Sequence, residues 1–217
     1  MSGSPPTAER TGRAPHRVPE EVLGAIDVHL KEREVRREEL YERARSLRRL
    51  AQGTMARIHE GAAVDDAVEE IRARTRELAR ALDAGGRGDE GIAHDAFQEA
   101  AEAGLLHAIV RDEPLPSPSA LGVAPEAYLL GLGDVIGEVR RLVLADLARG
   151  RLDSAESRLA LMDVLYRSLL RFDTTRAILP LKPKQDTARS LLERTRGEVT
   201  MARVLARGPA HGRTEEA

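Results

Sequence analysis

The stretch Tyr128–Arg141, which reads YLLGLGDVIGEVRR, carries two acidic residues, Asp134 and Glu138, four positions apart in an apolar helical pattern. Like charges one helical turn apart repel each other and resist burial, so an acidic pair is unusual there. A second pair, Glu99 and Glu102, lies three positions apart in the upstream segment FQEAAEAG. Spacings of three or four place both carboxylates of a pair on one face of a helix.

Four carboxylates on two helices that face each other form a hard, oxygen-rich site that suits Mg²⁺ or Mn²⁺. We therefore predict that one cluster of acids both binds metal and carries out catalysis, with Glu99, Glu102, Asp134 and Glu138 as its members. The chemistry expected of such a site is the hydrolysis of phosphate esters, with a ribonuclease as the preferred interpretation.

The same acids have a purely structural interpretation, which these residues alone leave open. An acidic pair in an Ala-rich helix is usually a solvated face, and Arg140 or Arg141 could neutralise the downstream pair in an ordinary ion pair. Three glycines, Gly131, Gly133 and Gly137, lie in the same helical pattern, and each costs about 1 kcal/mol relative to Ala. They indicate either close packing of helix backbones, which we favour, or room for a ligand beside the acid.

Composition limits the class of protein. With 217 residues and 2% aromatics, the chain must pack its core with Ala, Leu and Val. It contains no cysteine, so disulfides and thiolate metal sites are excluded. No long apolar run and no apolar N-terminal signal core is present, and we expect a cytoplasmic protein that does not enter membranes. The net charge of −2 argues against a uniformly basic nucleic-acid binder but allows a local basic patch.

The periodicity predicts an all-α fold, a bundle of about six to seven helices with a long N-terminal helix. That first helix begins at Pro19, continues to Glu60 and ends at Gly61 as a C-cap. The other helices are expected at Ala62–Asp83, Asp89–Arg111, Pro125–Gly150, Asp153 or Ser154 to about Phe172, and Gln185–Ala206, with a loop at Asp112–Val123 and a turn at Asp173–Lys184. We expect residues 19–208 to form a single domain between disordered tails at 1–18 and 209–217.

Basic residues gather in the second half of the first predicted helix. The segment Arg43–Arg57 contains five arginines and no acid. At about 100° per residue, Arg45, Arg48 and Arg49 share a face and Arg43 lies off it. We predict that all four bind RNA phosphates, with the first three as the core of the surface. The alternative, an exposed face whose partners lie on another subunit, stays open.

Several of these segments resemble the translin family, which includes translin and translin-associated factor X. The most specific match is YLLGLGDVIGE, at 128–138. FQEAAEAGLLHAI at 97–109 is similar to the family's glutamate helix and keeps its downstream His107. Residues 36–61 resemble the basic first helix, and 197–208 match the spacing of the final helix.

The resemblance implies an all-helical subunit that assembles into a hollow shell, usually an octamer, around single-stranded RNA or DNA. The four acids occupy the positions at which the family's catalytic type binds divalent metal and cuts RNA, so we expect Mg²⁺ or Mn²⁺ as cofactor and a homo-octamer as the assembly. The chain departs from the family in its short Asp112–Val123 connection and its few aromatic residues. Two alternatives are a non-catalytic assembly that binds single strands and, less favoured, an all-α nucleotide pyrophosphatase.

Overall fold

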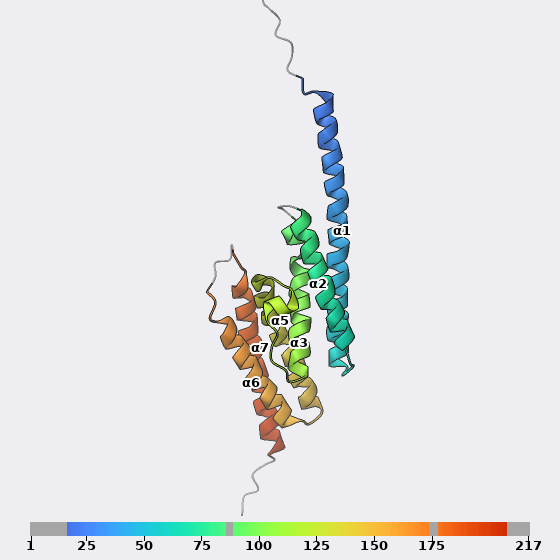
Figure 1. Ribbon diagram of the computed structural model, residues 1–217. Helices are drawn as coiled ribbons and strands as arrows, with labels where there is room; N and C mark the ends of the chain where they lie inside the picture. Colours follow the sequence, from blue (N-terminus) through green and yellow to red (C-terminus); the bar gives the residue numbers. More distant parts are fainter. Residues whose placement is uncertain (1–16, 86–88, 174–177, 208–217) are drawn as a thin grey trace, which may run out of the picture. The chain divides into compact units, whose positions relative to one another are not determined.

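The structure, a computed structural model, describes residues 17–85, 89–173 and 178–207, and every regular element in these ranges is helical. The elements are α1 (Glu20–His59), α2 (Asp65–Gly85), the 3₁₀ turn η1 (Glu90–Ala93), α3 (His94–Val110), α4 (Pro118–Leu121), α5 (Pro125–Ala148), α6 (Leu152–Leu169) and α7 (Leu181–Ala206) (Figure 1). The predicted all-α fold with a long first helix is confirmed. Most of the two predicted tails, residues 1–16 and 209–217, lies outside the described residues.

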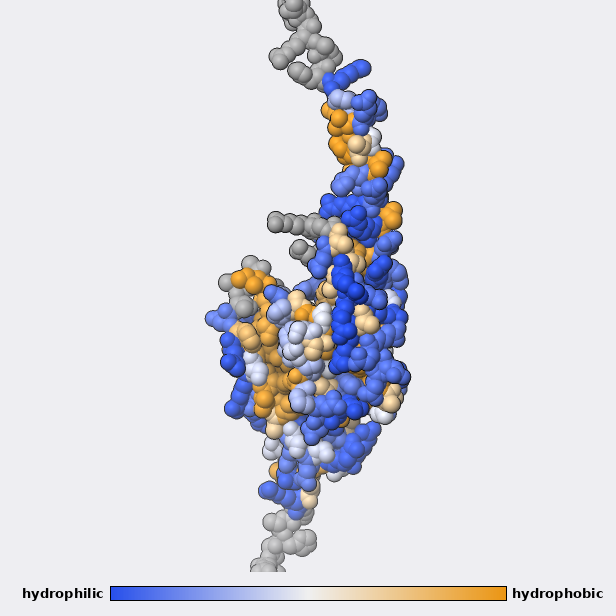
Figure 2. All heavy atoms as spheres, viewed as in Figure 1, coloured by the Kyte–Doolittle hydropathy of each residue, from blue (hydrophilic) through white to orange (hydrophobic). Residues whose placement is uncertain are grey.

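Internal contacts divide the chain into two units, Met1–Glu38 and Glu39–Ala217. The described part of the first unit is the N-terminal half of α1, where Val22, Ile26 and Leu30 are each about half exposed, at 45 to 56%. Figure 2 shows apolar atoms at the surface of this part of α1. The described residues of the first unit therefore present an apolar helix surface, and none of them is buried.

The core of the second unit surrounds α5. This helix packs against α3, α6 and α7, and α2 packs against α3 (Figure 1). The largest fully buried side chains are aliphatic, among them Leu47, Leu105, Leu106, Leu130, Ile136 and Met162. Small residues complete the packing on α3, where Ala96, Ala100, Ala101 and Ala103 are buried. The core is thus built from Ala, Leu and Val as the composition predicted. No helix in the described ranges is long and apolar enough to cross a lipid bilayer.

Most helix boundaries agree with the prediction, and the differences have local causes. Gly61 ends α1 as expected, with a left-handed φ of +78°. Helix α7 begins at Leu181, four residues before the predicted start, because Pro183 falls in its first turn and loses no helical hydrogen bond there. The predicted cap of α6 is wrong, since Arg151 stands at the N-cap without a side-chain hydrogen bond.

The segment before α5 is also more regular than predicted. It contains the single-turn helix α4, whose first turn is capped by a hydrogen bond from the backbone N–H of Ala120 to the Ser117 hydroxyl, at 3.2 Å. A Ser followed by Pro at the first helical position is the pattern of a helix start. The several prolines of this segment led to the prediction of a loop instead. Likewise the start of the third predicted helix is the 3₁₀ turn η1, and α3 itself begins at His94.

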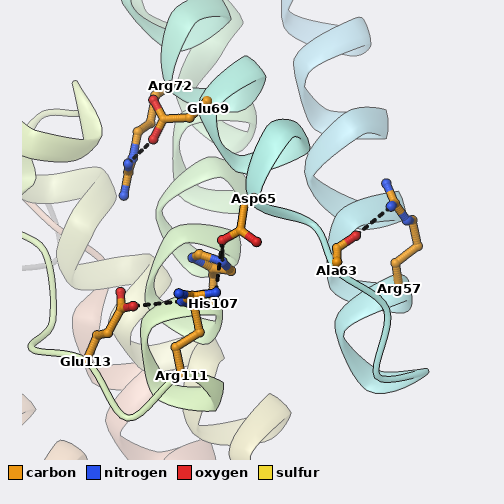
Figure 3. Close-up of polar contacts among 8 residues, drawn as sticks. All are labelled: Arg57, Ala63, Asp65, Glu69, Arg72, His107, Arg111 and Glu113. Atoms are coloured by element: carbon orange, nitrogen blue, oxygen red, sulfur yellow. Dashed lines mark hydrogen bonds and ion pairs between the residues drawn. The ribbon is translucent and has the colours of Figure 1, made fainter.

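Polar contacts fix α3 against α2 (Figure 3). The Asp65 Oδ1 atom lies 3.1 Å from His107 Nε2 and accepts a hydrogen bond from Arg111 Nη1, also at 3.1 Å. Arg111 Nε donates in turn to Glu113 at 2.7 Å. His107 is therefore engaged at the start of α2 and is not a member of the predicted metal site.

The three glycines of α5 differ in their surroundings. A Cβ on Gly131 would lie 2.8 Å from the Gln98 carbonyl oxygen and 3.0 Å from the Glu102 backbone nitrogen, so here the backbones of α3 and α5 are in contact. A Cβ on Gly133 would lie 3.0 Å from Lys184 Cβ, whereas one on Gly137 would meet only Leu191 Cδ1, at 3.7 Å. Close backbone packing therefore explains Gly131.

These surroundings predict opposite outcomes for two substitutions on one helix. We expect Gly131→Ala to lower the free energy of unfolding by about 1–3 kcal/mol, because the added methyl group overpacks a contact with backbone atoms. We expect Gly137→Ala to raise it by up to about 1 kcal/mol, because Ala favours the helix and has room there. Urea denaturation measures both. Equal effects of the two substitutions would contradict the close α3–α5 contact.

Candidate functional site

Helices α3 and α5 bring the four predicted acids together around Glu102. The Glu102 side chain is buried, with 8% of the residue exposed. Burial, followed by the negative charges of Asp134, Glu99 and Glu138, raises its pKa from 4.5 to about 8, and the positive charge of Lys184 opposes this rise. All three other acids therefore lie close enough to act electrostatically on the Glu102 carboxyl group. We call Glu99, Glu102, Asp134 and Glu138 the acidic cluster.

Asp134 is held by residues from two neighbouring helices. The Lys184 ammonium nitrogen, from α7, lies 2.5 Å from Oδ1 and 2.8 Å from Oδ2 of Asp134. Gln98, from α3, donates a hydrogen bond from Nε2 to Oδ2 of the same carboxylate at 2.5 Å. Both Asp134 oxygens are thus occupied by donors, and one of these donors carries a full positive charge.

Two further members of the acidic cluster contact α1. Glu138 Oε2 is hydrogen-bonded to His59 Nε2, on the last turn of α1. Glu99 Oε1 accepts a hydrogen bond from Gln52 Nε2 at 2.9 Å and lies 3.5 Å from Arg48 Nε. The second half of α1 therefore contributes side chains to the site, as α7 does through Lys184.

Glu102 differs from the other three because its carboxylate has no hydrogen-bond or ion-pair partner among the described residues, although its oxygens keep some contact with solvent. A buried carboxylate without a partner, surrounded by three more acids, is electrostatically costly. A divalent cation with oxygen ligands would relieve this cost, so the donor set fits Mg²⁺ or Mn²⁺. In the part of the chain that the structure describes, no three Asp, Glu or His side chains lie close enough together to hold an ion. Asp134 and Glu138 contact Lys184 and His59 instead.

The alternative in which Arg140 neutralises the acids of α5 is wrong. Arg140 reaches α7 instead, where its guanidinium donates two hydrogen bonds to the Glu198 carboxylate, at 2.7 and 2.8 Å, and one to the Thr195 hydroxyl at 2.6 Å. The hydrogen bonding with Arg140 lowers the pKa of Glu198. Arg141 lies 3.9 Å from Glu138, at the limit of an ion pair, and its side chain is mostly exposed.

The predicted RNA-binding arginines of α1 have acidic partners. Arg45 and Arg49 both contact Glu42, at 3.3 and 3.1 Å, just before the acid-free segment begins. Arg48 is directed towards Glu99 of the acidic cluster. Their side chains are half exposed or more, so the partners can be exchanged for solvent or phosphate. We call Arg45, Arg48 and Arg49 the arginine face.

Arg43 lies off the arginine face, as the helical spacing predicted. It lines a separate hollow of about 300 Å³ together with Ser46, Arg74, Glu77 and Leu78. Arg74 donates a hydrogen bond to the Ser46 hydroxyl at 2.8 Å. The hollow is therefore lined by two arginines, and none of its lining residues belongs to the acidic cluster.

Four residues of the site were not predicted from the sequence, namely Gln52, His59, Gln98 and Lys184. Gln98 lies next to Glu99 in the acidic segment that was singled out, and Gln52 shares the face of the arginines, so both could have been found. Lys184 is one of three lysines beside 31 arginines, which is a weaker signal. Nothing in the sequence around His59 indicated that it would contact Glu138.

The fold and the site together define a class of all-helical proteins. In this class, carboxylates from two central helices surround a buried glutamate. No protein-family model matches the chain. Among solved structures, apo-NeC3PO aligns with a TM-score of 0.77 at 20% identity, over 86% of this chain and 99% of that one, which shows the shared fold. AfC3PO aligns with a TM-score of 0.66 at 31% identity, over 84% of this chain and 97% of that one. The chain belongs to the translin family.

Two further comparisons concern relatives. The complex of AfC3PO with duplex RNA aligns with a TM-score of 0.67 at 29% identity, over 84% of this chain and 97% of that one. An uncharacterized protein of Methanocaldococcus jannaschii is 40% identical over 103 residues, which are 47% of this chain and 46% of the relative. The chain thus spans about half the length of this curated relative.

Proposed function

We propose that this protein is a metal-dependent endoribonuclease that cleaves single-stranded RNA within a hollow homo-oligomer. The observation that carries the proposal is the buried Glu102 carboxylate, which has no partner among the described residues and lies amid three further acids. The family supports RNA as the substrate, since its member AfC3PO has been solved with duplex RNA.

The residues of the site have distinct roles in this proposal. The acidic cluster would hold Mg²⁺ or Mn²⁺, and a bound cation would activate a water molecule and offset charge on the reacting phosphate. Gln52 orients Glu99, and His59 orients Glu138, as outer partners of ligating carboxylates do. Arg48 lies beside Glu99 and is placed to exchange that contact for an RNA phosphate. Such contacts do not distinguish bases, and cleavage is therefore expected to tolerate many sequences.

A single set of incubations separates the proposal from its alternatives. Labelled single-stranded RNA, duplex RNA and nucleoside triphosphates are each incubated with Mn²⁺, with and without EDTA. The proposal expects cleavage of the single strand that EDTA abolishes, with the duplex cut more slowly. RNA binding without cleavage would favour a non-catalytic assembly. Hydrolysis of the triphosphates alone would favour a nucleotide pyrophosphatase.

The proposed assembly is supported by the apolar surface of the first unit, where half-exposed Val22, Ile26 and Leu30 recur every four residues along α1. A helix with such a face is stabilised by burying it against other subunits. We therefore expect light scattering after size-exclusion chromatography to show a large homo-oligomer, with an octamer as the family-based expectation. A stable monomer at micromolar concentration would rule out a shell.

The arginine face is expected to bind RNA through its phosphate groups. Exchange of Arg45, Arg48 and Arg49 for Gln should weaken RNA binding to a similar extent across sequences. It should also make the log–log salt slope less negative by about 0.7 for each phosphate that an arginine no longer neutralises. Fluorescence anisotropy at several salt concentrations measures both quantities.

A second triple variant controls for the change in net charge. Arg149, Arg171 and Arg207 are exposed and form no ion pair among the described residues, and their exchange for Gln should leave the salt slope unchanged. If the arginine face pairs with another subunit instead, its triple variant breaks the oligomer. An intact oligomer with an unchanged slope would contradict a role in RNA binding.

A further inference from the structure

We propose that the Lys184 ammonium group is a built-in counter-ion of the acidic cluster, which must leave Asp134 before a divalent cation can bind there. The inference rests on the proposed function, because it specifies how the same site exchanges one cation for another. In this proposal Lys184 holds the Asp134 carboxylate while the site is without metal. It releases Asp134 when the metal binds and contacts it again when the metal leaves.

The contacts of Asp134 are the first support. Lys184 Nζ lies within 2.8 Å of both carboxylate oxygens, and Gln98 occupies Oδ2 in addition. A metal ion at Asp134 needs at least one of these oxygens. An ammonium group and a divalent cation compete for these oxygens, because positive charges at such distances repel each other. We therefore expect metal binding through Asp134 to displace the ammonium group.

The backbone beside Asp134 leaves room for the Lys184 side chain. A Cβ on Gly133 would lie 3.0 Å from Lys184 Cβ, 3.4 Å from its Cγ and 3.7 Å from its Cδ, so the lysine stem crosses α5 directly over this glycine. A glycine within a helix costs about 1 kcal/mol relative to Ala. At Gly133 the missing side chain makes room for Lys184.

The position and type of this cation also indicate a specific role. Lys184 lies in the first turn of α7, a turn without acidic residues, where the helix dipole disfavours positive charge. It is one of three lysines in a chain with 31 arginines. Lysine carries a compact charge on a flexible stem, whereas arginine would hold a carboxylate through a planar fork. The Lys184 side chain is 30% exposed, so it has a path into solvent.

Amine modification of the full-length wild-type protein tests the exchange directly. The protein is treated with limiting acetic anhydride in EDTA or in saturating Mn²⁺, and mass spectrometry gives the modification rate of each lysine. We expect Lys184 to react several-fold faster in Mn²⁺. Lys182, in the same turn and 74% exposed, and Lys31, 70% exposed, serve as internal controls whose rates should not change. An unchanged Lys184 rate at Mn²⁺ concentrations that calorimetry shows to be saturating would overturn the inference.

Calorimetric Mn²⁺ titrations of variants supply an independent readout. Lys184→Gln should bind Mn²⁺ at least about tenfold more tightly than wild type, because a competing charge has been removed. Lys182→Gln removes the same charge from the same helical turn and should leave the affinity close to that of wild type. Equal effects of the two variants would show a general charge effect and contradict the exchange.

The outcomes for this inference and for the proposed function are distinguishable. If wild type binds Mn²⁺ and Lys184→Gln binds it no more tightly, the metal site stands and the counter-ion role is wrong. If neither protein binds Mn²⁺, while circular dichroism shows both to be folded, the metal site and the inference are both wrong. Tight binding by Lys184→Gln alone would support the counter-ion role even where wild-type binding is too weak to measure.

Discussion

Exchange of Glu102 for Gln is expected to lower the rate of RNA cleavage at least about 100-fold, because even outer partners of metal ligands contribute 10- to 100-fold. Gln keeps the volume of the side chain and removes its charge. Its amide suits the buried position at least as well as an ionised carboxylate does, so the helical fold should be retained. Cleavage of labelled RNA in Mn²⁺ measures the effect, and circular dichroism and light scattering check fold and assembly.

Two further variants sharpen this experiment. Asp134→Asn should reduce cleavage to a similar extent, because it removes a second charged oxygen from the acidic cluster. Glu126→Gln makes the same chemical change as Glu102→Gln, but at an exposed position in the first turn of α5, and should leave the rate unchanged. Wild-type cleavage rates for both Glu102→Gln and Asp134→Asn would show that the acids are not catalytic.

The metal-free protein should lose stability as the pH rises from about 5 to about 8.5, and Glu102 is the reason. Its pKa is raised to about 8 in the folded protein against 4.5 for the ordinary group. Between these values the folded state binds more protons than the unfolded chain, so the free energy of unfolding falls as pH rises. At about 1.4 kcal/mol per pKa unit the loss amounts to several kcal/mol, or roughly 10 °C in melting temperature for a chain of this size.

Thermal melts of wild type and Glu102→Gln in EDTA measure this contribution as a difference. The variant has no titrating group at this position, so its melting temperature should depend less on pH and should exceed that of wild type above pH 8. Groups that do not interact with Glu102 titrate equally in both proteins and cancel, so the difference reports on Glu102 together with the charges coupled to it. Parallel pH profiles would contradict the buried, unpartnered state of Glu102.

The fold and the acids could be predicted from the sequence because they depend on local spacing. Acids three and four positions apart share a helix face wherever the helix lies, which is why Glu99 and Glu102 were found together with Asp134 and Glu138. All described elements are helices. This also follows from local sequence features, namely the helical periodicity and the glycine that ends α1.

The partners of the acids depend on tertiary packing, and spacing does not encode it. Lys184 lies in α7, whose predicted start was four residues too late. The prediction therefore assigned Lys184 to a turn. His59 reaches Glu138 across 79 positions of sequence. Arg140 was considered as a partner of the Asp134–Glu138 pair because it follows closely in the sequence, but Glu198 and Thr195 of α7 bind it instead. Each of these pairings depends on which helices lie next to α5 in the folded protein.

The contact at Gly131 has a consequence for how the protein tolerates sequence change. A Cβ there would lie 2.8 Å from the Gln98 carbonyl oxygen, 2.9 Å from Ala101 Cβ and 3.0 Å from the Glu102 backbone nitrogen, so main-chain atoms and one alanine methyl group of α3 face this glycine. The close approach of the two helices therefore depends on small residues at Gly131 and Ala101. The larger core residues can diverge while this contact is kept, which accords with a fold shared with apo-NeC3PO at 20% identity.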